Sequence, residues 1–517
     1  MTIPIESMNT LRDRREKVLK NVSPEKLAAL HARGSFSARE RIDTLFDDGS
    51  FQELGMHAHH NAVSFGMAGR ELPTDGVITG TGYIGDMQVA SFSQDFQVLA
   101  GTMGKMQARK IVRLMRHALR VGVPMVAFKD SGGARIQEGV DALSGYGDVF
   151  YYNVMLSGVV PQIAVICGPC AGGAAYSPAL MDFVIMTRHN AYMFLTGPEV
   201  IKAVTGRTAT MDEVGSAEMH ASVSGNVHFI AENDEHAINL VKQLLTYLPP
   251  NNTEDPPHDM SVPIDEMEDQ GIYDLIPGSS SDPLDMHAVI RRIVDNGQLF
   301  EVHANFAQNV IIGFARICGM VIGVVGNQPM VRAGALDMDA ADKIARFVRM
   351  CNVFNIPLIT LVDVPGFLPG VEQERGGIIR HGAKMLHAFA SCTTPKITVI
   401  LRKAYGGSYL AMCSQEMRAD MVYAWPSAEI AVMGAEAAVK ILYRKEIEQA
   451  TDRKAKGAEL AQDYRDKFAS PYAAASNFYI TDVIDPADTR WMLALALRKS
   501  LGKRELRPAK KHGNMPL

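Results

Sequence analysis

The sequence predicts an α/β fold that is built twice in one chain. The segment from Pro124 to Asp130 is echoed by the segment from Pro357 to Asp363, an offset of 233 positions. In both halves, short apolar runs rich in β-branched residues alternate with segments of helical periodicity, as in parallel strands joined by helices. A Pro- and Asn-rich stretch, 249–257, separates the halves. We therefore predict two domains related by internal duplication, residues 1–255 and 256–517.

The offset holds for landmarks along most of each half. It is 233 for Gly101 with Gly334 and for Lys110 with Lys343, 234 for Pro161 with Pro395 and for Gly172 with Gly406, and 237 for Gly197 with Gly434. Chance does not keep one offset nearly constant over so many positions. Each half is therefore one copy of the same arrangement of elements.

Within each half we expect helix, strand, loop, helix, strand, Gly-Gly and helix, in that order. Residues 105–119 and 339–353 show helical periodicity. The predicted strands are short, apolar and rich in β-branched residues, which is typical of buried parallel strands, and they cover 125–128, 163–166, 358–362 and 397–401.

One glycine pattern imitates a dinucleotide site. Gly80, Gly82 and Gly85 fit the fingerprint GxGxxG, but the residues after them, 86–92, have the pattern of a strand. The fingerprint requires a helix whose N-terminus binds the pyrophosphate. We interpret the pattern as a hairpin turn, with a similar hairpin around Gly319. Because a P-loop motif is also missing, we expect this chain to bind no nicotinamide, flavin or nucleoside triphosphate.

The bulk properties narrow the functional class. The 517 residues carry a formal net charge of −5, which disfavours nucleic-acid binding, and we interpret the basic tail, 503–511, as a solvated terminus. The N-terminus lacks an apolar signal region, and no apolar run is long enough for a membrane span. Six cysteines indicate a reducing, cytoplasmic location. Cys167 and Cys170 lack a second pair for zinc, so we expect core residues and no metal site.

The two Gly-Gly pairs are the first candidate for chemistry. Gly172-Gly173 and Gly406-Gly407 each follow an apolar strand and precede a helix. Such a turn exposes backbone N–H groups, the helix dipole adds positive potential, and glycine allows close approach of a ligand. The product is an oxyanion hole. A single pair would more often serve tight packing, but two pairs at equivalent places favour function.

Two further loops follow strand ends, where ligands bind in open α/β sheets. Ser131, Gly132, Gly133 and Ala134 form a loop suited to cradle a thioester or pantetheine through the backbone. For Arg135 two interpretations stay open, a phosphate ligand and a salt bridge to Glu138 or Asp141. In the second half, Val364, Pro365, Gly366 and Phe367 form a rigid apolar loop suited to a compact hydrophobic ligand.

No side-chain nucleophile or base stands out in the sequence. Ser131 and Ser177 lack a neighbouring histidine signal, and His228, His381 and His387 are scattered, although His381 is close to the loop of the second half. The sequence thus suggests stabilised enolates without a conspicuous protein base. This fits a reaction in which a cofactor brings the base.

With these residues identified, the chain resembles the β-type carboxyltransferase subunits of biotin-dependent acyl-CoA carboxylases. It is similar to subunits of propionyl-CoA carboxylase, methylmalonyl-CoA carboxyltransferase and methylmalonyl-CoA decarboxylase. The resemblance extends from about Ser37 to the end, and its motifs are KDSGGARIQEG from Lys129, GPCAGGAAYSP from Gly168, VDVPGFLPG from Val362, RKAYGG from Arg402 and WPSAE from Trp425.

The resemblance implies two tandem crotonase-like (ClpP/crotonase) domains and a homo-hexamer, a trimer of dimers. The active site would lie at a dimer interface, between the first domain of one chain and the second domain of another. It implies carboxyl transfer between biotin, carried on a partner subunit, and the α-carbon of a short acyl-CoA such as propionyl-CoA. The hole residues carry over to Gly172 and Gly173, assigned to the thioester on the acyl-CoA side, and to Gly407 and Ser408 on the biotin side. The partner would be a biotin carboxylase or biotin carrier subunit, or a decarboxylase subunit if the reaction runs in reverse.

Two departures refine this expectation. The segment around Lys105 lacks the Met-Lys-Met pattern of a biotinylated lysine, so biotin must come from a partner. Leu410 stands where propionyl-CoA carboxylases usually carry Asp, and in this family that position influences which acyl group fits. Two alternatives are a non-catalytic hexameric scaffold, disfavoured by the intact Gly-Gly pairs, and a crotonase-type hydratase, which would need paired carboxylates near the first hole.

Overall fold

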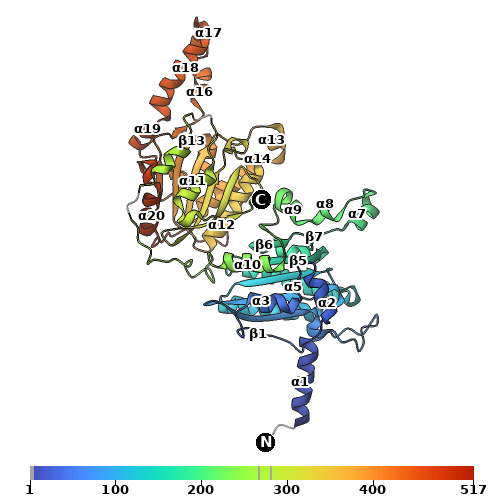
Figure 1. The fold of residues 1–517 in the computed structure, drawn as a ribbon. Helices are drawn as coiled ribbons and strands as arrows, with labels where there is room; N and C mark the ends of the chain where they lie inside the picture. The colour runs from blue at the N-terminus through green and yellow to red at the C-terminus, as the bar shows by residue number, and fades with distance from the viewer. Residues whose placement is uncertain (1–4, 266–267, 280–281) are drawn as a thin grey trace. The chain divides into compact units, whose positions relative to one another are not determined.

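The computed structural model describes residues 5–265, 268–279 and 282–517 (Figure 1). The chain folds into two compact units, Met1–Glu254 and Asp255–Leu517. Each unit is an α/β structure around one eight-stranded sheet. The two sheets are mixed, with an antiparallel hairpin at one side and parallel strands at the centre, which confirms the predicted α/β class and duplication.

The first unit places its strands in the order β1-β2-β3-β4-β5-β6-β8, with β7 paired to β5. The strands are β1 (Gln52–Glu53), β2 (Val77–Ile84), β3 (Met87–Gln94), β4 (Met125–Ser131), β5 (Gln162–Ala171), β6 (Phe183–Thr187), β7 (Tyr192–Phe194) and β8 (Phe229–Ala231). The helices are α1 (Ile5–Leu19), α2 (Pro24–His31), α3 (Ala38–Leu45), α4 (Lys105–Val121), α5 (Val140–Leu156), α6 (Tyr176–Ala179), α7 (Pro198–Thr205), α8 (Met211–Gly215), α9 (Ala217–Met219) and α10 (Asp234–Leu245).

The second unit repeats this order as β9-β10-β11-β12-β13-β14-β16, with β15 paired to β13. Its strands are β9 (Phe300–Val302), β10 (Val310–Ile317), β11 (Met320–Asn327), β12 (Leu358–Val364), β13 (Lys396–Tyr405), β14 (Met421–Ala424), β15 (Glu429–Ala431) and β16 (Asp482–Val483). Its helices are α11 (Met286–Ile293), α12 (Met338–Val353), α13 (Val371–Gly376), α14 (Ile378–Ser391), α15 (Gly406–Ala411), α16 (Ala435–Leu442), α17 (Arg444–Gln449), α18 (Arg453–Tyr464), α19 (Pro471–Ser476) and α20 (Thr489–Ser500).

The duplication holds down to strand register. Phe92 pairs with Ala127 between β3 and β4, and Val325 pairs with Thr360 between β11 and β12, which keeps the offset of 233. Both units also shift register near the end of the next strand pair, between Lys129 and Ser131 and between Val362 and Val364. The equivalent loops of the two units therefore leave the sheet at equivalent positions.

The predicted helices and strands are present, and some of them are longer than the hydrophobic pattern of the sequence indicated. The helices expected at 105–119 and 339–353 are α4 and α12, and α4 ends where Gly122 adopts φ 75° as its C-cap. The GxGxxG pattern is the β2–β3 hairpin, as expected, and the second hairpin turns at Gly319 between β10 and β11. β4 continues past the predicted 128 to Ser131 because its polar side chains, Lys129 and Asp130, are buried among partners.

Each unit has its own hydrophobic core. In the first, residues such as Ile111, Leu114 and Ile166 are fully buried between the sheet and helices α4 and α5. In the second, the fully buried Trp425 joins the core and donates from Nε1 to Thr489 Oγ1 at 2.9 Å. All six cysteines are buried and free, so Cys167 and Cys170 are core residues as expected. In the described parts of the chain, every helix is too short or too polar to cross a membrane.

Candidate active site at the strand ends

A glycine in left-handed conformation ends the central strand of each unit. Gly172 follows β5 with φ 59° and opens a short 3-10 turn, Gly172–Ala175, that leads into α6. Gly406 follows β13 with φ 58° and opens α15. A side chain in this conformation is strained, which explains why glycine stands at both places. The first N–H groups after each turn have no carbonyl within their own helix, so they remain available to a ligand.

The second glycine of each turn has room for an added Cβ. A Cβ placed on Gly407 would meet no atom within 4 Å, and one placed on Gly173 would meet the ring of Tyr146 at 3.6 Å, an ordinary contact. The hydroxyl of Ser408 is buried and donates to the carbonyl oxygen of Tyr405 at 2.7 Å, so Ser408 has only its backbone N–H to offer. Gly172 with Gly173, and Gly407 with Ser408, thus lie at equivalent turns of the two units, and their assignment as oxyanion holes stays a prediction.

The loop after β4 lies directly beside the first turn. A Cβ on Gly133 would come within 3.0 Å of the carbonyl oxygen of Ala171, the residue before the turn. The loop is held in place by its backbone: the N–H of Gly132 donates to Ala100, and the carbonyl of Gly133 accepts from Met103, both at 2.9 Å. Ser131 is fully buried, so only the backbone around Gly132 and Ala134 is accessible to a ligand.

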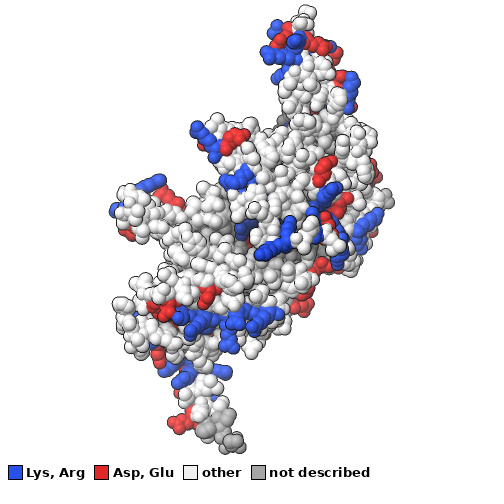
Figure 2. Space-filling model, turned by 180° about the vertical axis from the view of Figure 1, so that it is seen from behind, with Lys and Arg blue, Asp and Glu red and all other residues white. Residues whose placement is uncertain are grey.

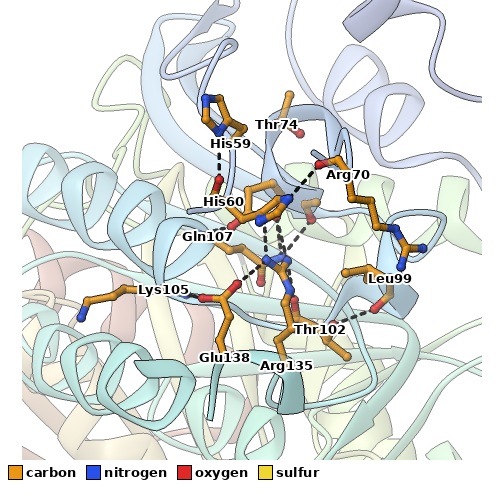
Figure 3. A network of polar contacts seen from close by, with 12 residues as sticks. His59, His60, Arg70, Thr74, Leu99, Thr102, Lys105, Gln107, Arg135 and Glu138 are labelled. Atoms are coloured by element: carbon orange, nitrogen blue, oxygen red, sulfur yellow. Dashed lines mark hydrogen bonds and ion pairs between the residues drawn. The ribbon is translucent and has the colours of Figure 1, made fainter. Parts of the chain in front are cut away.

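Arg135 does not reach a phosphate, which corrects one of its two predicted roles. Its guanidinium is fully buried and pairs with Asp75 at 2.6 Å and with Glu138 at 2.8 Å. It also donates to the carbonyl oxygen of Thr102 at 3.0 Å. Figure 3 shows this group at the centre of a polar network, with Glu138 in turn accepting from the backbone of Lys105. The salt-bridge interpretation is therefore the right one, and Arg135 anchors the loop.

The loop after β12 repeats this construction in the second unit. The N–H of Leu336 donates to the carbonyl of Gly366 at 3.1 Å, and the N–H of Leu368 donates to Leu336 at 2.7 Å. The ring of Phe367 lies against Gly382 of α14, where an added Cβ would be 3.0 Å away. Val364 is fully buried and contributes to the core, whereas residues 365–367 are half-buried and accessible.

A buried arginine–aspartate pair stands at the end of the strand before each loop. Arg41 of α3 binds Asp234 at 2.7 Å and Asp130 at 3.1 Å in the first unit. Burial raises the pKa of Asp130 to about 6, although Arg41 opposes this shift. In the second unit Asp363 accepts both Nε and Nη2 of Arg402, at 2.9 and 2.6 Å. Both loops thus start from a strand end that is fixed electrostatically.

The two predicted serines and His381 make structural contacts. Ser177 Oγ donates to Asn153 Oδ1 at 2.9 Å, and Ser131 Oγ accepts from the N–H of Gly133 at 3.2 Å. His381 lies in α14, where its Nδ1 is 2.8 Å from a carboxylate oxygen of Asp342. In the described parts of the chain, neither serine is thus paired with a histidine as a nucleophile would be.

A polar cavity of about 300 Å³ adjoins the loop after β4, and the sequence-based prediction did not include it. Its lining residues are Asn61, Ala62, Val63, Ser64, Lys105, Met106, Arg109, Gln137, Glu138 and Asp141. Among the described residues, Arg109 has no ion-pair partner, so its charge is available to an anion.

Arg109 also begins a row of four arginines on α4, continued by Arg113, Arg116 and Arg120. Figure 2 shows Lys and Arg side chains gathered in a band across one face of the first unit. The spacing i, i+4, i+7 and i+11 of these arginines was a readable signal for such a face.

Comparison with known proteins identifies the family. The protein-family model described as "Carboxyl transferase domain" matches residues 29–515. The chain belongs to this carboxyltransferase family.

Several relatives match the chain over nearly its full length. The methylmalonyl-CoA carboxyltransferase 12S subunit of Propionibacterium freudenreichii subsp. shermanii is 53% identical over 98% of this chain and 96% of that protein. The carboxyltransferase subunit of propionyl-CoA carboxylase from Haloferax mediterranei is 49% identical over 99% of both chains. The α subunit of methylmalonyl-CoA decarboxylase from Veillonella parvula is 50% identical, also over 99% of both.

A crystal structure of transcarboxylase 12S has the same fold. It matches with a TM-score of 0.97 and 51% identity, and the alignment covers 100% of this chain and 99% of that one. That structure is described as a hexamer assembly with methylmalonyl-coenzyme A and methylmalonic acid bound. The expected carboxyltransferase fold is therefore confirmed.

Leu410 lies close to the Gly406-Gly407 turn, in the second unit of this carboxyltransferase. It is on α15, three residues after Gly407, and its side chain is 40% exposed. Leu410 is therefore not a core residue, and it presents an apolar surface on the helix that begins at Gly406. Its role in selecting the acyl group stays a prediction.

Proposed function

We propose that this chain is the carboxyltransferase subunit of a biotin-dependent enzyme that acts on short acyl-CoA thioesters. It moves a carboxyl group between biotin on a partner subunit and the α-carbon of propionyl-CoA, methylmalonyl-CoA or a similar substrate. The observation that carries the proposal is the pair of equivalent turns at Gly172 and Gly406, each with a left-handed glycine at the end of a central strand and a helical turn after it. A reaction with two partially negative carbonyl oxygens needs two such sites.

In the first unit, the N–H groups of Gly172 and Gly173 hold the thioester oxygen of the acyl-CoA. Negative charge grows on this oxygen when the α-carbon loses its proton, and fixed donors stabilise that charge more than the ground state. The accessible backbone around Gly132 and Ala134 keeps the thioester beside the turn. Glu138 and Asp75, the carboxylates beneath this loop, are both bound to Arg135, which argues against a hydratase that needs two free carboxylates.

In the second unit, the N–H groups of Gly407 and Ser408 hold the carbonyl oxygen of the biotin ureido ring. Biotin, delivered in carboxylated form, supplies both the carboxyl group and the basic nitrogen that the side chains lack. The open space at Gly407 and the half-buried apolar loop 365–367 fit a compact bicyclic ligand. Val364 supports this loop from the core, and Phe367 shapes it by packing on Gly382.

The nucleotide end of the acyl-CoA fits the cavity that contains Lys105 and Arg109. Coenzyme A carries its negative charge on phosphates remote from the thioester, and this cavity adjoins the thioester loop through Gln137 and Glu138. Arg109 supplies an unpaired charge for a phosphate, and the arginine row on α4 raises the local concentration of anions.

The partners follow from the family. We propose a homo-hexamer, a trimer of dimers, working with a biotin carboxylase or biotin carrier subunit, or with decarboxylase subunits. The meeting of the first turn of one chain with the second turn of another stays a prediction. The six free cysteines fit a reducing compartment, and we propose the cytoplasm.

The direct test is decarboxylation of methylmalonyl-CoA by the purified protein with free biotin as acceptor. We expect biotin-dependent loss of carbon dioxide and formation of propionyl-CoA. A folded protein without this activity, over a series of short carboxyacyl-CoAs, would favour the scaffold. Hydration of crotonyl-CoA without biotin would favour the hydratase. The subunits that co-purify set the direction: a biotin carboxylase indicates carboxylation, and a membrane decarboxylase subunit indicates breakdown.

Replacing Arg109 by glutamine should raise the KM for acyl-CoA roughly 10-fold, because one charge-assisted contact to a phosphate is lost. The kcat should stay within about twofold, since the contact is equal in ground and transition states. Steady-state kinetics at two salt concentrations measure both effects. Arg120→Gln, at the far end of α4, is the matched control and should leave KM nearly unchanged; equal effects of both variants would contradict the assignment.

Replacing Leu410 by aspartate should change the ratio of kcat/KM values between propionyl-CoA and butyryl-CoA by roughly 10-fold, the range expected when one wall of an acyl pocket changes. The fold should tolerate the substitution because the side chain is 40% exposed. Competition between the two substrates in one reaction measures the ratio. Leu410→Met keeps the apolar surface and is the control. An unchanged ratio in the aspartate variant would leave Leu410 as a packing residue.

A further inference from the structure

A buried lysine contacts the helix that follows the first glycine turn. Lys129 comes from β4, two residues before the thioester loop, and is 2% exposed. Its Nζ donates to Ser177 Oγ at 3.0 Å. Ser177 belongs to α6, the helix that follows directly on the turn Gly172–Ala175. The hydrogen bond therefore joins the strand that ends in the thioester loop to the helix that begins at the oxyanion turn.

The charge of Lys129 has no counter-ion within the described parts of the chain. None of the ion pairs there includes Lys129, and the neighbouring Asp130 is bound to Arg41. The groups that face its Nζ are the ring of Phe92 from β3, at 4.7 Å, the hydroxyl of Ser177 and the thiol of Cys170 from β5. Burial raises the pKa of Cys170 to about 12, so this thiol is neutral at physiological pH.

Burial also lowers the pKa of Lys129, from 10.5 to about 8. At pH 7 the side chain is therefore still mostly an ammonium. An unpaired buried charge is unfavourable for folding, so its presence calls for another reason than stability.

The second unit shows that the fold does not need this lysine. At the offsets that relate the two units, Lys129 corresponds to Val362 of β12, and Ser177 corresponds to Ala411 of α15. Both residues are fully buried and apolar. The same strand and the same helix thus pack together without this polar pair, beside a turn of the same backbone conformation. The polar pair is a property of the first site only.

We propose that Lys129 is a positioning residue of the first oxyanion site, which orients α6 through Ser177 and places a buried positive charge behind the turn of Gly172 and Gly173. This inference rests on the proposed function. The charge acts at the moment when the thioester oxygen becomes negative, and a low-dielectric interior weakens its effect little.

The decisive variant, Lys129→Val with Ser177→Ala, replaces the polar pair of the first unit by the apolar residue types that stand at Val362 and Ala411 in the second unit. We expect kcat to fall roughly 10-fold, less than for loss of a direct donor, with KM for acyl-CoA within about twofold. Wild-type activity should decline as pH rises through about 8, where Lys129 loses its proton, and this decline should be missing in the variant. Lys129→Gln with Ser177 intact retains a hydrogen bond but removes the charge. Comparison of its kcat with that of the double variant therefore separates the effect of the charge from the effect of the hydrogen bond.

Stability supplies a readout that does not depend on activity. Because the folded pKa of Lys129 lies below its ordinary value, the charged form costs stability below pH 8, and this cost disappears as pH rises from 8 toward 10.5. Lys129→Val alone, which keeps the hydrogen bond from Ser177 to Asn153, should therefore unfold at a higher temperature than the wild type at pH 7, and the difference should shrink at pH 10. Lys396→Met is the control, because the buried Lys396 Nζ donates to the carbonyl oxygens of Phe389 and Met417 and its loss should lower stability.

The outcomes separate this inference from the function on which it rests. A double variant with wild-type kcat and pH profile, in an otherwise active enzyme, would overturn the role of Lys129 and leave the carboxyltransferase proposal standing. A Lys129→Val variant less stable than the wild type at pH 7 would also overturn it, because Lys129 would then serve the fold. An inactive wild type would overturn the proposed function, and with it the role of Lys129 in catalysis.

Discussion

Valine at Gly407 is expected to lower carboxyl transfer at least about 100-fold while the protein stays folded. The backbone of Gly407 has an ordinary conformation, and an added Cβ meets no atom within 4 Å, so the side chain enters free space instead of the core. On the proposed function, a ligand oxygen bound to the N–H groups of Gly407 and Ser408 would lie beside this side chain. A branched side chain there keeps a ligand oxygen out of hydrogen-bonding range. The kcat of methylmalonyl-CoA decarboxylation with free biotin measures the loss.

Two other glycines provide the controls for this experiment. Gly457→Val, at an open position of α18, adds the same bulk away from either turn and should leave kcat unchanged. Gly406→Ala should reduce stability instead, because Gly406 has φ 58° and its Cβ would lie 3.0 Å from the carbonyl oxygen of Val432. The same loss of activity as in the Gly407 variant is expected for Gly173→Val. Wild-type rates for both the Gly173 and the Gly407 variant would refute the assignment of the two holes.

Loss of Arg402 is expected to destabilise the second unit by about 3–5 kcal/mol. Arg402 is 2% exposed and binds the carboxylate of Asp363, which is 1% exposed. In Arg402→Met this carboxylate stays buried without its cation, and the carbonyl of Asp282 loses the donor at 2.7 Å. Urea unfolding followed by circular dichroism measures the change. Because Asp363 lies in β12 directly before residues 364–367, transfer activity should fall in the same variant.

A surface ion pair is the matched control for Arg402. Arg444 and Glu448 are 2.9 Å apart on α17, with side chains 77% and 54% exposed. Arg444→Met should therefore cost at most about 1 kcal/mol, because water already solvates both charges. A cost for Arg402→Met no larger than for Arg444→Met would mean that the buried pair in the second unit is not what holds the strand end.

Much of the site was readable in the sequence because its signals are local. Glycine is favoured where the backbone adopts φ near 60°, so the glycines in the sequence mark the paired turns at Gly172 and Gly406. Apolar and β-branched runs mark buried strands by the same local logic, and the duplication then placed the turns at equivalent strand ends. The predicted strand after Pro124 stopped too early because Lys129 and Asp130 look like loop residues until their partners are known.

The class of fold, the duplication and the two backbone turns could be predicted from the sequence, since they depend on residue type and spacing alone. The burial and the partners of the charged side chains became known only from the folded structure. Arg135 pairs with Asp75, 60 positions earlier in the chain, and Lys129 meets Ser177, 48 positions later. Whether a charge is buried, paired or free depends on which distant segments the fold brings to it. That physical dependence is why Lys129 and Arg135, two charged residues of one motif, and Arg109 in the cavity beside it could be assigned only from the structure.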